Sequence, residues 1–460
     1  MTTIDVLPDD VLLAIFDFYV VRTSGEKCNI EAWQTLVHVC RRWRCVAFES
    51  PRRLDLRLVC TSGTPVGESL DIWPALPPDI SGTIASASVD DIVAALGHND
   101  RVIGIDLRLG KTGSLQWDKV LAAMQVPFPA LTRLLLLCQD GLAPNLPDTF
   151  LGGSAPHLQY LVMKHVPFPG IPNLLRSATH LTRLVLQCIP LSGYISPEAM
   201  ATCLSALTNL ITLTLFLDYE FLDSISLRRP PPITRFILPN LTMFWFKGAS
   251  EYLDDLLARI DTPRLHCVFM SFFLQTNLDT PHLVQFTSRT PMFQEPNEAH
   301  VILDLDAEVR LLWSSDNFRR ISVEISYEDE ESYLQVSSIA QVCAMCLLPF
   351  PTVENLRLGV FSVKTLPSEL EWKDYVEDDQ WLELLRPFTA VKNLYLSEEF
   401  QPDIATALEE LIRGGTTEVL PSLQNIFLAN FEPSGPFQEA IGQFLAARQL
   451  SGYHIAVLPM

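Results

Sequence analysis

A short apolar pattern recurs along most of the chain from about residue 100 onward. Each instance places apolar residues at its first, fourth and sixth positions, and a proline or another turn residue usually precedes it. The last two apolar positions flank one variable residue, as in a strand that buries one face. The sequence therefore predicts a series of short strands. They start at Val102, Leu131, Leu158, Leu181, Leu210, Leu241, Leu265, Phe318, Val353, Val391 and Leu423, and more weakly at Leu283.

Stretches with helical periodicity lie between several of these strands. Ser196-Pro197-Glu198 is a typical helix start, because serine caps the first turn and proline fits inside it. An apolar stripe follows this start, and comparable stripes occur further along the chain. The stripes are Met200, Leu204 and Leu207; Leu253, Leu256, Leu257 and Ile260; Leu408, Leu411 and Ile412; and Phe437, Ile441, Phe444 and Leu445.

A strand, a turn and a helix in units of twenty to forty residues resemble leucine-rich repeats, which stack into a solenoid. Apart from the weak region between Leu265 and Phe318, starts of neighbouring clear units lie from 23 to 38 residues apart, so the repeats are irregular. The resemblance implies an α/β fold in which residues 99–460 form an irregular arc or horseshoe. The pattern is weakest over residues 275–315, and residues 56–98 are expected to connect the repeats to the N-terminus. Residues 437–458 are expected to cap the far end.

The first fifty residues carry a different pattern. Leu7-Pro8-Asp9-Asp10 is a helix start, because proline suits the first turn and aspartate complements the positive helix end. Two apolar stripes follow, separated by a polar interruption at residues 20–30. So small a piece with so much apolar surface is expected to pack on the rest of the chain or on a partner. The first stripe is Leu12, Ile15, Phe16 and Tyr19, and the second contains Trp33, Leu36, Val39, Cys40, Trp43, Val46 and Ala47.

The segments Leu7-Pro8-Asp9-Asp10-Val11-Leu12-Leu13-x-Ile15-Phe16 and Leu36-Val37-x-Val39-Cys40-Arg41-Arg42-Trp43-Arg44 resemble an F-box, as found in a large group of fungal proteins. The resemblance implies a three-helix module over residues 1–55 that binds the Skp adaptor of cullin-RING ubiquitin ligases. The repeats would then select the protein substrate. The resemblance does not separate the adaptor face from its supporting core, and both would come from Leu7, Pro8, Val11, Leu12, Ile15, Phe16, Leu36, Val39, Cys40 and Trp43.

Variable residues of each strand point away from its buried face, because side chains alternate. We call these positions the slots. They hold seven basic and two acidic residues, although acids outnumber bases 54 to 33 in the chain. Arginine and aromatic residues are enriched at binding interfaces, so an acidic or phosphorylated partner segment would suit this face. The alternative is that these residues occupy exposed strand positions by chance. The slots contain Arg108, Arg133, Lys164, Arg183, Lys247, Arg320 and Arg357; Asp106 and Glu324; and Tyr160, Trp245, Phe269, Tyr395 and Phe427.

The composition excludes several classes of protein. A net charge of −21 argues against nucleic-acid binding by bulk charge. No apolar run approaches the roughly 18 residues of a spanning helix, and the N-terminus lacks a signal-peptide pattern. The ten cysteines lie in apolar segments, as in a reduced intracellular protein of the cytoplasm or nucleus. The pair Cys343 and Cys346 lacks a second ligand pair and falls on a helical stripe, so no metal site is predicted.

Motifs for catalysis are also missing. Gly110-Lys111-Thr112 ends like a phosphate loop, but Ile105 stands where that loop requires its first glycine. Neither a nucleophile elbow nor a dinucleotide fingerprint occurs. We therefore expect a non-catalytic subunit without a cofactor. Two alternatives remain: a repeat scaffold with no ligase role, whose N-terminal helices cap the repeats, and an enzyme with an unrecognised site.

Overall fold

The computed structural model describes most of the 460-residue chain. The chain divides into two compact units, Met1–Tyr194 and Ile195–Met460. None of the helices within the described residues is both long and apolar enough to cross a membrane. The described residues are 7–22, 32–49, 57–61, 67–69, 76–84, 89–110, 114–138, 145–217, 234–273, 280–303, 307–313, 316–326, 335–345, 350–359, 378–397, 419–429 and 436–460.

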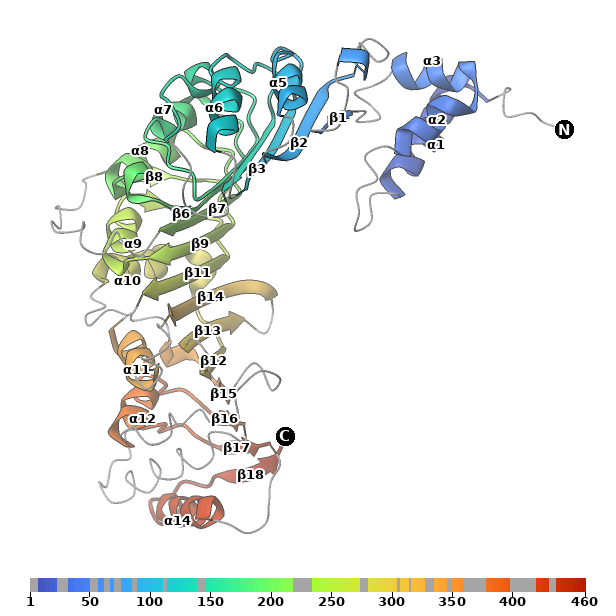
Figure 1. Cartoon of the computed structure of the whole chain (residues 1–460). Helices are drawn as coiled ribbons and strands as arrows, with labels where there is room; N and C mark the ends of the chain where they lie inside the picture. The colour runs from blue at the N-terminus through green and yellow to red at the C-terminus, as the bar shows by residue number, and fades with distance from the viewer. Residues whose placement is uncertain are drawn as a thin grey trace. The chain divides into compact units, whose positions relative to one another are not determined.

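The first unit begins with three helices, α1 (Asp9–Arg22), α2 (Ala32–Val39) and α3 (Arg41–Glu49) (Figure 1). The first turn of α1 starts at Pro8, whose carbonyl accepts from the backbone N–H groups of Val11 and Leu12. These helices share a small core, so the N-terminal segment has its own buried interior. Its buried members are Leu12, Leu13, Phe16, Leu36, Val37, Val46 and Ala47.

The rest of the first unit is a parallel sheet whose strands follow the order of the chain. Residues 56–98, expected as a connection, already contribute two strands and a helix to it. The strands are β1 (Leu58–Cys60), β2 (Pro78–Ile84), β3 (Gly104–Leu109), β4 (Arg133–Cys138), β5 (Tyr160–Lys164) and β6 (Arg183–Ile189). The helical segments are α5 (Asp90–Leu96), α6 (Ser114–Ala123), α7 (Ile171–Ser177), η2 (Phe150–Gly153) and η3 (Leu191–Gly193).

The second unit contains a longer sheet, in the spatial order β7-β9-β11-β14-β13-β12-β15-β16-β17-β18. All of its pairs are parallel except β14–β13 and β13–β12, which are antiparallel. Its strands are β7 (Thr212–Leu217), β9 (Met243–Gly248), β11 (Cys267–Phe273), β12 (Glu298–Leu303), β13 (Ala307–Trp313), β14 (Asp316–Ser326), β15 (Asn355–Gly359), β16 (Asn393–Leu396), β17 (Asn425–Leu428) and β18 (Ala456–Pro459); β8 (Phe236–Ile237) and β10 (Ile260–Asp261) form a separate pair.

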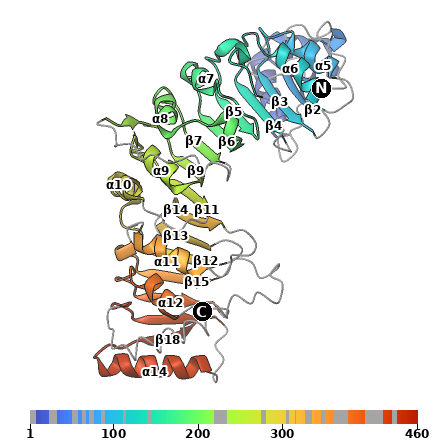
Figure 2. The same cartoon turned by 60° about the vertical axis from the view of Figure 1, so that its left-hand side comes forward.

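Helices α5, α6 and α7 of the first unit, and the helices of the second unit, lie on one face of their sheet and leave the other face open (Figures 1 and 2). Ser196 caps α8 as predicted, with its hydroxyl accepting from the Ala199 backbone N–H at 3.2 Å. The predicted stripe from Leu408 lies outside the described residues. Helical segments of the second unit are α8 (Pro197–Ser205), α9 (Ser250–Leu257), α10 (Pro281–Arg289), α11 (Gln335–Met345), α12 (Asp378–Leu385), α14 (Pro436–Leu450), η5 (Pro291–Phe293) and η7 (Phe350–Thr352).

The sequence prediction fails where the pattern was weakest. The weak strand expected at Leu283 is wrong, because this residue lies in α10. Its side chain and that of Phe286 are buried at i and i+3, a spacing that serves a helix as well as a repeat. The antiparallel strands β12 and β13 follow, and they interrupt the parallel ladder between β14 and β15. Elsewhere the mostly parallel sheet is consistent with a leucine-rich-repeat-like solenoid.

Candidate functional sites

Helix α1 separates two roles that the sequence left together. Leu12 and Phe16 are fully buried and pack into the three-helix core. Val11 and Ile15, one position earlier in each turn, are 42% and 41% exposed. Because residues four apart lie on one helix face, these two form an exposed apolar stripe. The sequence put Ile15 in one apolar stripe with Leu12 and Phe16 and did not separate the adaptor face from the core.

Other residues of the predicted adaptor site divide in the same way. Leu36 is buried, whereas Val39 at the end of α2 is 55% exposed. The Trp43 ring is half-buried and lies 4.8 Å from the Phe16 ring, so it closes the core. Leu7 and Cys40 are half-buried and Pro8 is exposed. Two aromatic residues of α1 that the sequence left out of the site are exposed as well, Phe18 at 61% and Tyr19 at 39%.

Arg42 connects the N-terminal end of α1 to α3. Arg42 donates from Nη2 to the Leu7 carbonyl at 2.5 Å and to the Asp9 carboxylate at 2.6 Å. Arg44 donates from Nε to the Val37 carbonyl at 3.0 Å, which joins α3 to α2. These bonds hold the three helices in one arrangement, and the exposed stripe of α1 is therefore presented by a packed module.

The slot residues lie on the open face of both sheets, as predicted from side-chain alternation. Most of their neighbours in the strands are buried, while the slot residues named from the sequence are half-buried or exposed. In the first unit, Arg133, Tyr160 and Arg183 are register partners on adjacent strands. The Arg183 guanidinium lies 5.2 Å from the Tyr160 ring centre, and Lys164, four residues after Tyr160 in β5, is exposed.

In the second unit, one row of slots crosses ten strands in continuous register. Aromatic side chains stack at two places along it. The Trp245 and Phe269 ring centres are 3.9 Å apart at an interplanar angle of 18°, and those of Tyr395 and Phe427 are 4.5 Å apart at 10°. The row is Thr214, Trp245, Phe269, Ser322, Arg310, His300, Arg357, Tyr395, Phe427 and Leu458.

A cationic residue accompanies each aromatic pair. Arg320 lies 5.6 Å from the Phe269 ring centre, and Arg357 lies 4.2 Å from that of Tyr395. Lys247, another predicted slot residue, lies 6.0 Å from the ring centre of Phe273. A flat guanidinium over an aromatic face is a favourable contact, so both arginines are held in place.

The open face is less basic than the sequence predicted from its slot residues. That reading missed three carboxylates, Asp79, Glu298 and Glu308, because their strands lack the apolar pattern. Arg133 donates to Asp79 at 2.6 Å, and Arg357 donates to Glu298 at 2.7 Å. Arg310, also missed, donates to Glu308. Predicted cations of this face are therefore partly neutralised by neighbouring strands.

Glu298 contacts two basic side chains of the open face. Its Oε1 lies 2.7 Å from Arg357 Nε and 2.8 Å from His300 Nε2. Burial alone would raise the pKa of Glu298, but hydrogen bonds and charge from His300 and Arg357 outweigh it and hold the pKa below its ordinary value. Glu298 stays ionised and fixes the position of Arg357 beside Tyr395.

A ladder of asparagine side chains runs beside this group. Asn393 donates to the Asn355 side chain at 2.8 Å, and Asn425 donates to that of Asn393 at 2.8 Å. Asn355 donates in turn to the Asn297 carbonyl at 3.3 Å. The Asn355 and Asn393 amides both donate and accept, so the ladder joins β15, β16 and β17 at one register position.

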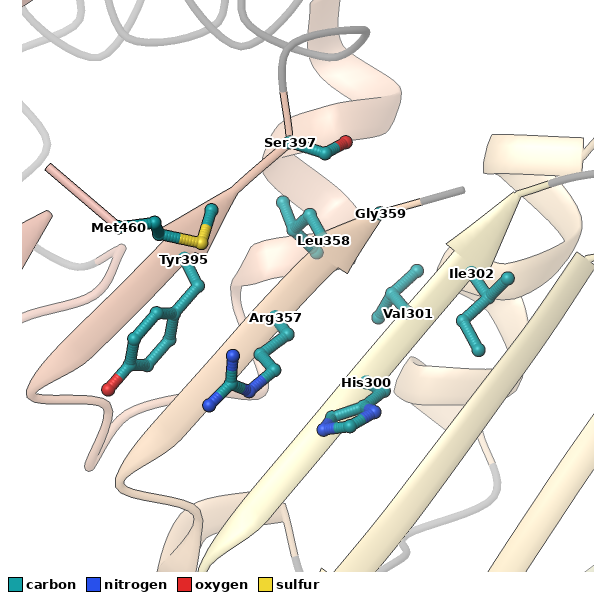
Figure 3. Close-up of a pocket in the computed structure, with 9 residues that line it drawn as sticks. All are labelled: His300, Val301, Ile302, Arg357, Leu358, Gly359, Tyr395, Ser397 and Met460. Atoms are coloured by element: carbon teal, nitrogen blue, oxygen red, sulfur yellow. The ribbon is translucent and has the colours of Figure 1, made fainter. Parts of the chain in front are cut away.

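A pocket of about 220 Å³ opens on the same face (Figure 3). Strands β12, β15 and β16 form it, and the end of the chain contributes Met460. His300, Arg357 and Tyr395 lie side by side along one edge, as Figure 3 shows. The sequence alone could not predict this pocket. Gly359 leaves space in it because glycine has no side chain.

The described part of the chain offers little support for catalysis or metal binding. No three His, Cys, Asp or Glu residues gather there as metal ligands. Cys343 is a buried residue of α11, as its apolar stripe predicted, while Cys346 lies outside the described residues. The Lys111 and Thr112 of the rejected phosphate loop also lie outside them.

Comparisons with known proteins add little to this geometry. No family model matches the chain, and no curated protein matches it. Among solved structures, it is similar to the leucine-rich repeat-containing protein LegL7 from Legionella pneumophila. That similarity has 14% sequence identity, covers 80% of this chain and 97% of the other, and gives a TM-score of 0.28. At this TM-score the likeness carries no inference about function.

Proposed function

We propose that this chain is the substrate-recognition subunit of a Skp-cullin-F-box ubiquitin ligase. Residues 1–55 bind the Skp adaptor as an F-box, and the repeats hold a protein substrate on their open face. The chain supplies no chemistry of its own. It raises the effective concentration of substrate near the ubiquitin-loaded partner of the cullin, which is how a binding subunit accelerates transfer.

The observation that carries this proposal is the division of α1 into two faces. Leu12 and Phe16 supply the core of the small module, whereas Val11 and Ile15 add apolar surface that the core does not need. Exposed apolar stripes of this kind mark contact surfaces. The stripe also falls within the segment whose residues resemble an F-box, so the resemblance and the exposure point to the same side chains.

Affinity capture with the full chain tests the adaptor role. A Val11→Asp, Ile15→Asp double variant should lose the Skp adaptor and the cullin, because charged side chains oppose burial in an interface. Val126→Asp is the matched control, since Val126 is 43% exposed and lies outside the three helices. If wild-type chain captures no Skp adaptor, the ligase role is wrong and the repeat scaffold without a ligase role becomes the better account.

A further inference from the structure

The open face of the first unit has an apolar centre on its last three strands. Leu135 on β4, Val162 on β5 and Val185 on β6 are register partners in one row. Their side chains share the open face with the slot residues, because alternate residues of a strand point the same way. Leu135 and Val162 are half-buried, and Val185 is 5% exposed. We call these three residues the apolar centre.

A basic side chain flanks the apolar centre at each end. Arg183 lies two residues before Val185 on β6, and Lys164 lies two residues after Val162 on β5. Both cations are exposed. Neither has a carboxylate within ion-pair distance in the part of the chain that the structure describes. Both are therefore available to the acids of a partner.

The open face of the first unit is positively charged. Asp79 contacts two guanidinium groups, those of Arg57 and Arg133, and Asp106 lies 3.9 Å from Arg108. These are the two acids in the described slots of β2–β6, which together with Arg57 hold five basic residues, so the face has a net charge of +3. The five basic residues are Arg57, Arg108, Arg133, Lys164 and Arg183.

We propose that the apolar centre and its two flanking cations bind an extended acidic segment of the protein substrate through carboxylate side chains. The inference rests on the proposed function and names the substrate class for the open face. Charge complementarity selects this occupant, because a positive surface with two exposed, unpaired cations attracts an anionic partner. The apolar centre adds contact area for an apolar side chain of the same segment.

The separation of the two cations favours two carboxylates over one phosphoryl group. Arg183 is the register partner of Tyr160, and Lys164 follows Tyr160 by four residues, which is about 13 Å of strand. The Arg183 guanidinium lies 5.2 Å from the Tyr160 ring centre, which keeps it at its own end of that span. A phosphoryl group is bound best by a cluster of arginines, whereas single cations so far apart suit separate carboxylates.

The same spacing predicts a sequence motif. In an extended segment along β5, the side chains that point to the sheet are two positions and about 6.6 Å apart. An acid beside Arg183 therefore places the residue two positions away over the apolar centre, and the residue four positions away beside Lys164. The expected motif is an acidic residue, any residue, an apolar residue, any residue and a second acidic residue. It reads the same in both chain directions.

Selection from a library of random linear peptides on the full chain tests this inference and should enrich the motif. The Lys164→Glu, Arg183→Glu double variant should weaken binding of a selected peptide at least about tenfold, because repulsion replaces attraction at both ends. The same variant should bind that peptide when lysine replaces both acids. Arg176→Glu is the matched control and should leave binding unchanged, because Arg176 is an exposed arginine of α7, on the helical face of the same unit.

Three outcomes would overturn the inference: selection of no peptide, selected peptides without acidic positions, or full binding by the double variant. Tighter binding of a peptide with one phosphoserine in place of the acids would overturn the choice of carboxylates. Self-association of the chain that the double variant abolishes would assign the face to a second copy and overturn the inference as well.

Capture of the Skp adaptor by the same variants is measured separately. Loss of adaptor capture with intact peptide binding contradicts the ligase role alone, while the reverse contradicts the peptide inference alone.

Discussion

The Asp79 carboxylate and the Arg133 guanidinium form an ion pair across an intervening strand. Arg133 Nη2 lies 2.6 and 2.9 Å from the two carboxylate oxygens, and both groups reach over Gly104 on β3. Asp79 is almost fully buried and also lies 3.3 Å from Arg57. Arg133, predicted to contact substrate, therefore has a structural partner, and reversing its charge would place two acids together.

Gly104 should be required for this ion pair. A Cβ there would lie only 2.3 Å from Asp79 Oδ1, so Gly104→Ala displaces the carboxylate from Arg133. We expect the free energy of unfolding to fall by about 1 to 3 kcal/mol, as when a buried charged group loses a partner. Denaturant unfolding measures the change. Gly110→Ala serves as control, because its added Cβ makes contacts of 3.7 Å or more. Equal effects of the two substitutions would contradict the role assigned to Gly104.

The asparagine ladder should depend on its middle member as a donor. Asn393→Asp can still accept from Asn425 but cannot donate to Asn355, and it sets a carboxylate against an amide oxygen. We expect a loss of roughly 1 to 3 kcal/mol in denaturant unfolding. The control is Asn173→Asp, because the Asn173 side-chain oxygen accepts from Arg176 and an aspartate there can still accept that bond. If the ladder does not stabilise the fold, the two variants will have the same free energy of unfolding.

Cysteine reactivity reports whether β1 belongs to the sheet. Burial, followed by the nearby charge of Asp79, raises the pKa of the Cys60 thiol to about 11. Because the thiolate is the reactive form, iodoacetamide at about pH 8 should modify the exposed Cys45 and spare Cys60. Peptide mass spectrometry identifies the labelled sites. Cys60 should react only after denaturant is added, and rapid labelling of native protein would contradict the sheet position of β1.

Acid should weaken the group around Glu298. Its pKa is lower in the folded chain than in the unfolded chain, so it stabilises the fold above its ordinary pKa. That contribution is lost as the pH falls through the folded-state pKa. The difference in unfolding free energy between wild type and Glu298→Gln should therefore be largest above about pH 4.5, the ordinary pKa of glutamate, and shrink as the pH falls below it. A difference that stays constant over this range would show that the charge of Glu298 adds nothing.

The apolar spacing predicted most strands of both sheets, because each repeat must bury its fourth and sixth positions. Leu134 and Leu136 are examples, and both are fully buried. β2 escaped prediction because Ser81, Gly82 and Thr83 interrupt its apolar positions. Strands β12 and β13 escaped because their antiparallel pairing needs no repeat.

These missed strands explain the error in the charge of the open face. The carboxylates that pair with Arg133 and Arg357 come from β2 and β12. The sequence pattern therefore identified the cations but not their partners. Neither the pocket beside Gly359 nor the division of α1 into a buried and an exposed face follows from residue types alone. Both depend on which side chain lies beside which in three dimensions.

Titration of purified Skp adaptor into the purified full chain tests the central claim most directly. The account predicts a saturable complex that the Val11→Asp, Ile15→Asp variant weakens about 100-fold or more, while Val126→Asp binds as wild type does. Circular dichroism of the variants confirms that their helices remain. The claim is contradicted if the wild-type chain does not bind the adaptor, or if both substitutions in α1 leave its affinity unchanged.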